Sequence, residues 1–180
     1  MLIQWNYYIV TASDSTGYHN EAKEFSRGNL QIPIRELREL DLPDSHAWNF
    51  VPLGYIPSTT PGHMAPTYPP GLPLIVSAAG IADGWGGAPF LVIPLLSLLC
   101  MPVMYGLGRE FGLPRGDAWA GGMILVACPT FQLMAIGQMS DCVATLWGML
   151  TIWLALRAAR RPNEALLAGA VLGMAVLTRP

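Results

Sequence analysis

The sequence predicts an all-α, polytopic transmembrane protein with a polar extracytoplasmic loop that contains short amphipathic helices. Of the 180 residues, 52% are hydrophobic and only 12% are charged, and the mean hydropathy is +0.39. An average soluble domain carries about twice that charged fraction. The charges are also unevenly placed, because residues 1–70 hold seven of the twelve Asp and Glu residues. The chain therefore divides into a polar front and a membrane-embedded remainder.

The first segment, residues 1–12, is moderately apolar and contains a cluster of aromatic residues, Trp5, Tyr7 and Tyr8. Aromatic side chains gather at the interface between a bilayer and water. We therefore expect this segment to be the end of a truncated transmembrane helix, and residues 13–70 to follow as an extracytoplasmic loop.

Two helices are expected within this loop. Asp14 precedes residues 15–27, where apolar side chains recur at helical spacing, and Gly28 follows as a typical helix end. A shorter helix is predicted over residues 34–40. Residues 42–73 are rich in proline, glycine and aromatic residues, which indicates either disorder or a functional binding loop. The many aromatic residues favour a binding loop.

The remaining residues, 71–180, contain the predicted membrane helices. A crossing needs about 20 apolar residues, and residues 85–108 and 118–137 contain no charged side chain. A third span is expected at residues 139–156. Residues 165–180 would form a truncated span, so we expect the chain to be part of a longer polypeptide. Residues 71–82 are too short for a crossing and are predicted to be a short or re-entrant helix.

Arginines set the expected orientation of these spans. Short cytoplasmic loops carry an excess of Lys and Arg, and two loops separated by two spans hold five arginines, namely Arg109, Arg115, Arg157, Arg160 and Arg161. Both loops can then face the cytoplasm, which places Asp141 on the outer side. If residues 71–82 do not cross the membrane, the polar front lies on that same side.

Two acidic residues are candidates for a functional role. Asp14 has a simple structural interpretation as a helix N-cap. Asp141 lies near the outer end of a span, where an acidic residue usually faces a polar cavity, although a solvated turn residue is an equal alternative. On one outer face, the two carboxylates would suit a general base and a second acid that positions a ligand.

Other residues give weaker signals. Clustered basic residues are absent, so nucleic acid is not an expected partner. His19 and His63 could join Asp14 in a metal site, but the sequence lacks metal-ligand spacing and surface histidines are favoured. No cofactor is assigned, and a divalent metal stays open. Arg179 could pair with a lipid phosphate or extend to the headgroups.

Five segments occur in a distinctive order. They are Ser13-Asp14-Ser15-x-x-Tyr18, Tyr68-Pro69-Pro70-Gly71-Leu72-Pro73-Leu74, Tyr105-x-x-Gly108-Arg109-x-Phe111-Gly112, Pro129-x-Phe131 with Gln138-Met139-Ser140-Asp141, and Leu177-Thr178-Arg179-Pro180. Together they resemble integral-membrane glycosyltransferases of the GT-C fold, the superfamily of dolichyl-phosphate-mannose protein mannosyltransferases and lipid A aminoarabinose transferase.

The resemblance implies an N-terminal-half fragment of a larger enzyme, with further membrane helices on both sides. It implies transfer of a hexose or pentose from a polyprenyl-phosphate donor to a lipid, glycan or protein acceptor. The site would face outward from the cell membrane, most simply a bacterial inner membrane. Asp14 is carried over as the catalytic carboxylate and Asp141 as the second acid, and an inverting displacement with Asp14 as general base is the simplest mechanism.

The residues expected to bind substrate or donor are Tyr18, His63, Tyr68, Pro69, Pro70 and Arg179. Many family members have Asp-Glu at the first acidic position, whereas here Ser15 follows Asp14. This departure weakens the case for a metal. The alternative hypothesis is a fragment of a multi-span transporter with Asp141 in the substrate path, because proline and glycine interrupt the spans.

Overall fold

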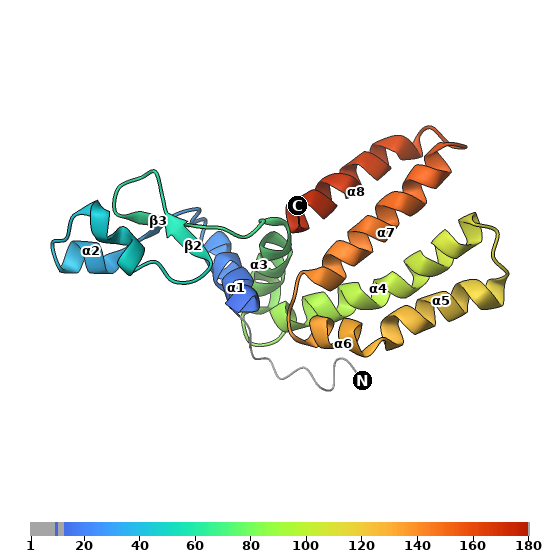
Figure 1. Ribbon diagram of the computed structural model, residues 1–180, viewed down its shortest axis with the longest axis horizontal. Coiled ribbons are helices and arrows are strands. Elements are labelled where there is room, and N and C mark those ends of the chain that lie inside the picture. Colours follow the sequence, from blue (N-terminus) through green and yellow to red (C-terminus); the bar gives the residue numbers. More distant parts are fainter. Residues whose placement is uncertain (1–9, 11–12, 180) are drawn as a thin grey trace.

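The structure is a computed structural model that describes residue 10 and residues 13–179. The predicted helix end at residues 1–12 lies outside the described residues except for Val10. The described chain is mostly helical, as expected, and two parts lie at opposite ends of its long axis. One is a bundle of long helices and the other is a small unit with a β-sheet, with α1 and α3 between them (Figure 1).

Helices α1 (Ser13–Ser26) and α3 (Gly71–Asp83) pack against each other between the two parts. Their contact forms because Tyr18 and Ala22 of α1 lie on one helical face and join the same apolar cluster as Leu72 of α3. Both helices contribute side chains that are almost fully buried. Helix α1 begins earlier than the predicted residue 15, so Asp14 lies inside its first turn.

The small unit, which we call the sheet unit, comprises the elements between α1 and α3. These are β1 (Ile32–Pro33), α2 (Arg35–Glu39), η1 (Asp44–Asn49), β2 (Tyr55–Pro57) and β3 (His63–Pro66). The strands form an antiparallel sheet in the order β1-β3-β2. The sequence predicted only helices and a loop in this region, so the sheet is a correction.

The sequence did not predict the sheet, and the reason is physical. Each strand has two to four residues and ends at a proline, which is too short to show the alternation of a strand. The unit has its own apolar cluster of Ile34, Leu37 and Ala47. Of the two alternatives for residues 42–73, disorder is wrong, because these residues contain η1, β2, β3 and the first turn of α3, whereas a binding role stays a prediction.

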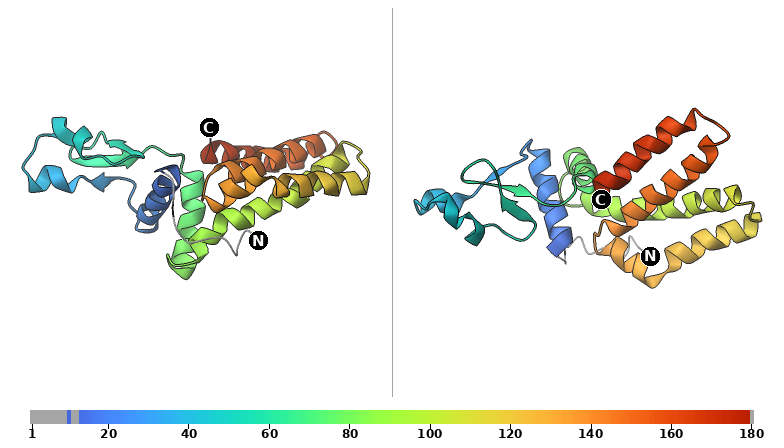
Figure 2. Two further views of the ribbon diagram at one scale, coloured as in Figure 1. Left: turned by 60° about the horizontal axis from the view of Figure 1, so that its bottom comes forward. Right: turned by 45° about the horizontal axis from the view of Figure 1, so that its top comes forward.

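The bundle contains the remaining helices. These are α4 (Ala88–Glu110), α5 (Arg115–Ala127), α6 (Pro129–Ile136), α7 (Asp141–Ala158) and α8 (Glu164–Thr178). Helix α4 packs against α5 and α7, and α7 also packs against α8 (Figure 2). By length and composition, α4 and α7 can each cross a membrane. Helices α3 and α8 are apolar but shorter.

Helices α5 and α6 form a bent pair where the sequence predicted one span over residues 118–137. Their axes differ by 55°. Taken together across the break, the two helices are long and apolar enough to form one span. The break follows from Pro129, which begins α6 and forces the preceding Cys128 into an extended backbone with ψ 122°. The proline therefore starts a new helix instead of continuing α5.

The direction of the helices gives the bundle two chemically different ends. Helix α7 starts and α8 finishes next to α1 and α3, whereas the α4–α5 and α7–α8 connections lie together at the far end (Figure 1). Asp141 and Arg179 lie at the first end. The far end contains the arginines of both connections.

Candidate functional site

A group of polar side chains meets where α1, α7, α8 and the segment before α3 come together. We call it the carboxylate cluster, and its members are Asp14, Tyr18, Tyr68, Ser140, Asp141 and Arg179. They come from four segments that are far apart in the sequence. All the predicted site residues except His63, Pro69 and Pro70 belong to it.

Asp14 is held by Tyr68. The Tyr68 hydroxyl donates a hydrogen bond of 2.9 Å to Asp14 Oδ1, across 54 positions of sequence. The Tyr68 ring lies directly against Gly17, one turn along α1, where an added Cβ would come within 2.1 Å of the ring. Glycine at position 17 therefore leaves the space that lets Tyr68 reach Asp14.

Tyr18 joins the same cluster from the next turn of α1. Its ring centroid lies 4.7 Å from that of Tyr68, and its hydroxyl lies 3.0 Å from Ser140 Oγ, immediately before α7. Burial raises the pKa of the Tyr18 hydroxyl. Burial, together with the hydrogen bond to Asp14, raises the pKa of Tyr68 to about 12. Both tyrosines stay protonated near neutral pH, so Tyr68 is the donor to the Asp14 carboxylate.

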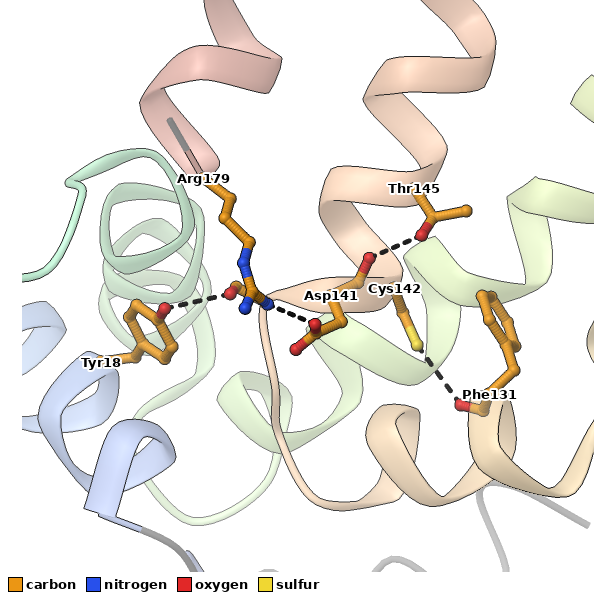
Figure 3. A network of polar contacts seen from close by, with 7 residues as sticks. Tyr18, Phe131, Asp141, Cys142, Thr145 and Arg179 are labelled. Carbon is orange, nitrogen blue, oxygen red and sulfur yellow. Dashed lines mark hydrogen bonds and ion pairs between the residues drawn. The ribbon is translucent and has the colours of Figure 1, made fainter.

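Asp141 has a cationic partner. It is the first residue of α7 and forms an ion pair with Arg179, which immediately follows α8 (Figure 3). The Asp141 side chain is 39% exposed and that of Arg179 is 55% exposed, so solutes can reach both. Figure 3 shows Tyr18 pointing toward this pair from α1. A partly exposed guanidinium beside a carboxylate keeps donors that can bind an anion.

A buried hydrogen-bond network supports the turn before Asp141. Gln138 has a left-handed backbone with φ 59° and donates from Nε2 to the Phe90 carbonyl at 2.9 Å. Its Oε1 lies 3.4 Å from His19 Nε2, and the His19 ring stacks on that of Phe90 at 4.9 Å. These contacts fix the α6–α7 turn against α1 and α4.

The expectation that His19 lies on the surface is therefore wrong. Its side chain is only 4% exposed, because α1 turns this face toward Phe90 and Gln138. Burial lowers the pKa of the His19 imidazole. The neutral ring is favoured, and it serves as a packing and hydrogen-bonding group.

The other predicted residues lie outside the cluster. Pro69 and Pro70 immediately precede α3, and Pro70 is its N-cap. His63 belongs to β3, where its Nδ1 lies 2.9 Å from the Pro61 carbonyl. It lines a hollow of about 550 Å³ in the sheet unit together with residues such as Arg38. The structure does not bring His63 together with Asp14 or Asp141.

The donor set of the cluster does not fit a metal ion. Within residue 10 and residues 13–179, no group of three or more His, Cys, Asp or Glu side chains is arranged to hold one. Asp141 is already paired with Arg179, a cation.

Sequence reasoning did not single out Ser140 and Gln138 as site residues. Both are almost fully buried and hold the turn before α7 in place. The sequence did contain a signal for Ser140 and Gln138, because both are polar residues in the short segment between two apolar stretches. Their partners, Tyr18 and Phe90, are distant in sequence and could not be identified from it.

Comparisons with known proteins assign the family. The family model for dolichyl-phosphate-mannose-protein mannosyltransferases matches residues 70–180, which is more than half of the chain. The matched part includes Asp141 and Arg179, whereas Asp14 precedes it. Comparisons with curated proteins and with solved structures found no match. The family match favours a glycosyltransferase over the transporter alternative. The chain belongs to the dolichyl-phosphate-mannose-protein mannosyltransferase family, which consists of membrane glycosyltransferases of the GT-C type.

Proposed function

We propose that the protein transfers a sugar from a polyprenyl-phosphate donor to a hydroxyl of a lipid, glycan or protein acceptor. The carboxylate cluster is the proposed site of transfer, and the sugar is a hexose or a pentose. The proposal rests on family membership and on one observation in particular. Two partly exposed acids, one bound by a neutral tyrosine and one paired with an arginine, meet at the same end of the bundle.

Asp14 is the proposed general base. An alcohol is a weak nucleophile near neutral pH, and a carboxylate within hydrogen-bond reach can accept its proton as it attacks the anomeric carbon. The hydrogen bond from Tyr68 orients Asp14 by occupying Oδ1, which leaves the Oδ2 side of the carboxylate for the acceptor. Tyr68 also belongs to the segment with Pro69 and Pro70 that leads into α3, and this segment would form one wall of the substrate site.

Arg179 is the proposed ligand of the donor phosphate. Guanidinium groups bind phosphate oxygens through two parallel hydrogen bonds, and the Arg179 side chain is more than half exposed. Asp141 holds this guanidinium in position. When the glycosidic bond breaks, the negative charge that develops on the lipid phosphate would lie beside Arg179 and be stabilised by it.

The proposed reaction is a single displacement that inverts the anomeric carbon. The leaving group is already a phosphate, so protonation by a general acid is not required. The acceptor oxygen attacks from the side of Asp14, its proton passes to the Asp14 carboxylate, and the bond to the lipid phosphate breaks on the side of Arg179. Attack and departure on opposite faces of the sugar give inversion.

The proposed location is the outer face of a cell membrane, with a bacterial inner membrane as the simplest case. The support is the separation of charge along the bundle. Arginines of the α4–α5 and α7–α8 connections lie at the end opposite the carboxylate cluster, and arginine-rich short loops mark the cytoplasmic side.

Substitution Asp14→Asn tests the proposed base. Asn has nearly the same shape and retains an oxygen that can accept from Tyr68, but it cannot take a proton. With polyprenyl-phosphate mannose as donor and an envelope extract as acceptor source, we expect release of polyprenyl phosphate to fall by at least about 100-fold.

The matched control is Asp117→Asn. Asp117 also lies in the first turn of a helix, α5, but at the far end of the bundle. We expect this variant to release polyprenyl phosphate like the wild type. Equal release by Asp14→Asn and the wild type would remove Asp14 from catalysis, and equal thermal unfolding midpoints would show that any loss is chemical.

A further inference from the structure

The far end of the bundle contains a second charged feature, which neither family membership nor the proposed transfer explains. A hollow of about 400 Å³ is lined by Glu110, Arg157, Arg160 and Arg161. We call it the arginine pocket. It lies between the end of α4 and the α7–α8 connection, where Arg160 forms an ion pair with Glu110.

The pocket has an excess of positive charge. Three arginines line it against the single acid Glu110, and Glu164 next to it forms ion pairs with Arg157 and Arg161. The α4–α5 and α7–α8 connections, together with the helix ends beside them, contain five arginines and three acidic residues. Arginine is charged at all physiological pH values, so the excess persists whatever the local pH.

The three arginines differ in their contacts and in their exposure. The Arg157 guanidinium is fixed by an ion pair of 2.7 Å with Glu164 and lies 5.5 Å from the centre of the Trp153 ring. The Arg160 and Arg161 side chains are 67% and 70% exposed. Each guanidinium has five N–H donors in a planar fork, so one carboxylate contact leaves donors that point to solvent.

We propose that the arginine pocket binds a phosphate group, with Arg160 and Arg161 as its ligands. Planar guanidinium groups match phosphate oxygens through paired hydrogen bonds, and two of them can hold one phosphate between them. Arg157 contributes charge from the base of the pocket. Glu110 opposes the anion and holds Arg160 in place until the anion binds.

The position of the pocket indicates that the phosphate belongs to a membrane lipid. It lies at the ends of α4 and α7, the two helices that can each cross a bilayer. The segments at this end of the bundle also carry exposed apolar side chains, including Phe111 after α4 and Leu166 in the first turn of α8, which are 66% and 85% exposed. Basic pockets between membrane helices bind anionic headgroups while apolar side chains contact the acyl chains.

A titration of the purified protein in neutral detergent tests this site. Short-chain phosphatidylglycerol and inorganic phosphate serve as two separate probes, with phosphatidylcholine as the zwitterionic reference, and the shift in thermal unfolding midpoint reports binding. For the wild type we expect saturation by phosphatidylglycerol at concentrations that leave phosphatidylcholine without effect. The doubly substituted Arg160→Gln/Arg161→Gln variant should need at least about tenfold more of the anionic lipid.

Two further variants make the test specific. Glu110→Gln removes the acid that opposes the anion, so it should bind phosphatidylglycerol more tightly than the wild type. Arg35→Gln removes a charge from the exposed surface of α2 in the sheet unit and should bind like the wild type. Opposite shifts from the two pocket variants cannot arise from general loss of structure.

The outcomes separate as follows. Preference for phosphatidylglycerol over inorganic phosphate assigns the site to a lipid, whereas equal binding of both assigns it to phosphate from either source. Absence of binding by either probe overturns the proposal. Equal affinities of the double arginine variant and the wild type also overturn it, as does an equal loss in Arg35→Gln.

Discussion

Asp14 and Asp141 each lie in the first turn of a helix, but their partners have different charges. Asp14 accepts a hydrogen bond from the neutral Tyr68, whereas Asp141 is paired with the cation Arg179. A carboxylate that is hydrogen-bonded by a neutral hydroxyl through one oxygen keeps its other oxygen for a substrate, while a carboxylate in an ion pair holds its cationic partner in place. The same residue type at the same place in a helix thus acquires two different environments from tertiary contacts, and the proposed roles follow from that difference.

On the Asp141 side, the largest expected effect comes from removing the cation of the ion pair. Arg179→Gln leaves Asp141 without its partner and takes the proposed phosphate ligand away from the donor site. We expect transfer from polyprenyl-phosphate mannose to fall by about 100-fold, as for the loss of one donor that stabilises developing charge. Release of polyprenyl phosphate measures it.

The conservative variant Arg179→Lys separates charge from geometry. Lysine keeps the charge but cannot form paired hydrogen bonds, so partial activity is expected. Wild-type activity in Arg179→Gln would contradict the assignment of Arg179 to the donor phosphate.

The next largest effect is expected from a substitution that disturbs only the contact between Tyr68 and Asp14. Gly17→Ala places a Cβ within 2.1 Å of the Tyr68 ring, so Tyr68 must move and its hydrogen bond to Asp14 is lost. Overpacking of this kind destabilises a protein by about 1–3 kcal/mol. Thermal unfolding in detergent and the transfer assay should both show the loss.

The matched control for this substitution lies in the helix of Asp141. Gly148→Ala in α7 meets no atom within 4 Å, so it should unfold at the wild-type temperature or slightly above. Equal losses in both variants would show that Gly17 does not act through Tyr68.

The smallest effect on sugar transfer is expected for an acid on α1 that is not part of the cluster, where the change is one of stability. Glu21 is only 2% exposed, and burial raises its pKa from the ordinary value of 4.5 to about 7. The folded state therefore binds this proton more tightly than the unfolded state. The stability that it contributes is complete below pH 4.5 and is lost as the pH rises through about 7.

Glu21→Gln should remove that dependence. At pH 8 the variant should be more stable than the wild type, by at most about 3 kcal/mol, and at pH 4.5 the difference should vanish. His19 acts in the opposite direction, because its lowered pKa costs stability as the pH falls below its ordinary 6.5. The difference between variant and wild type at each pH cancels the His19 contribution. A difference that does not change with pH would contradict the assignment to Glu21.

The sequence was sufficient for the parts of the fold that depend on local composition. Helix α4 follows from a long stretch without charge, and α1 from the spacing of its apolar residues. The bend before Pro129 was not predicted, because a proline is tolerated in a membrane helix and also begins new helices. The sheet unit was missed because its strands are too short to show a period.

The candidate site was predictable as a set of residues but not as a set of contacts. Asp141 was identifiable because acids are rare at the edge of apolar segments, whereas Asp14 was identified only through the family resemblance, since its position alone indicates a helix cap. The Tyr68–Asp14 hydrogen bond spans 54 positions and the Tyr18–Ser140 contact spans 122. Such contacts depend on how α1 packs on α3 and meets the turn before α7, which local composition does not determine. His63 was also predicted as a site residue, but it belongs to the sheet unit and lies away from the cluster.

The two acids can be compared directly in one assay. Steady-state kinetics with polyprenyl-phosphate mannose would give kcat and KM for the wild type, Asp14→Asn and Asp141→Asn. The proposed roles predict that Asp14→Asn lowers kcat by at least about 100-fold with little change in KM, because proton transfer is lost while donor binding remains. Asp141→Asn should mainly raise KM for the donor. A reversed pattern, or equal changes in kcat and KM for both variants, would contradict the assignment of Asp14 as base and Asp141 as the acid that positions Arg179.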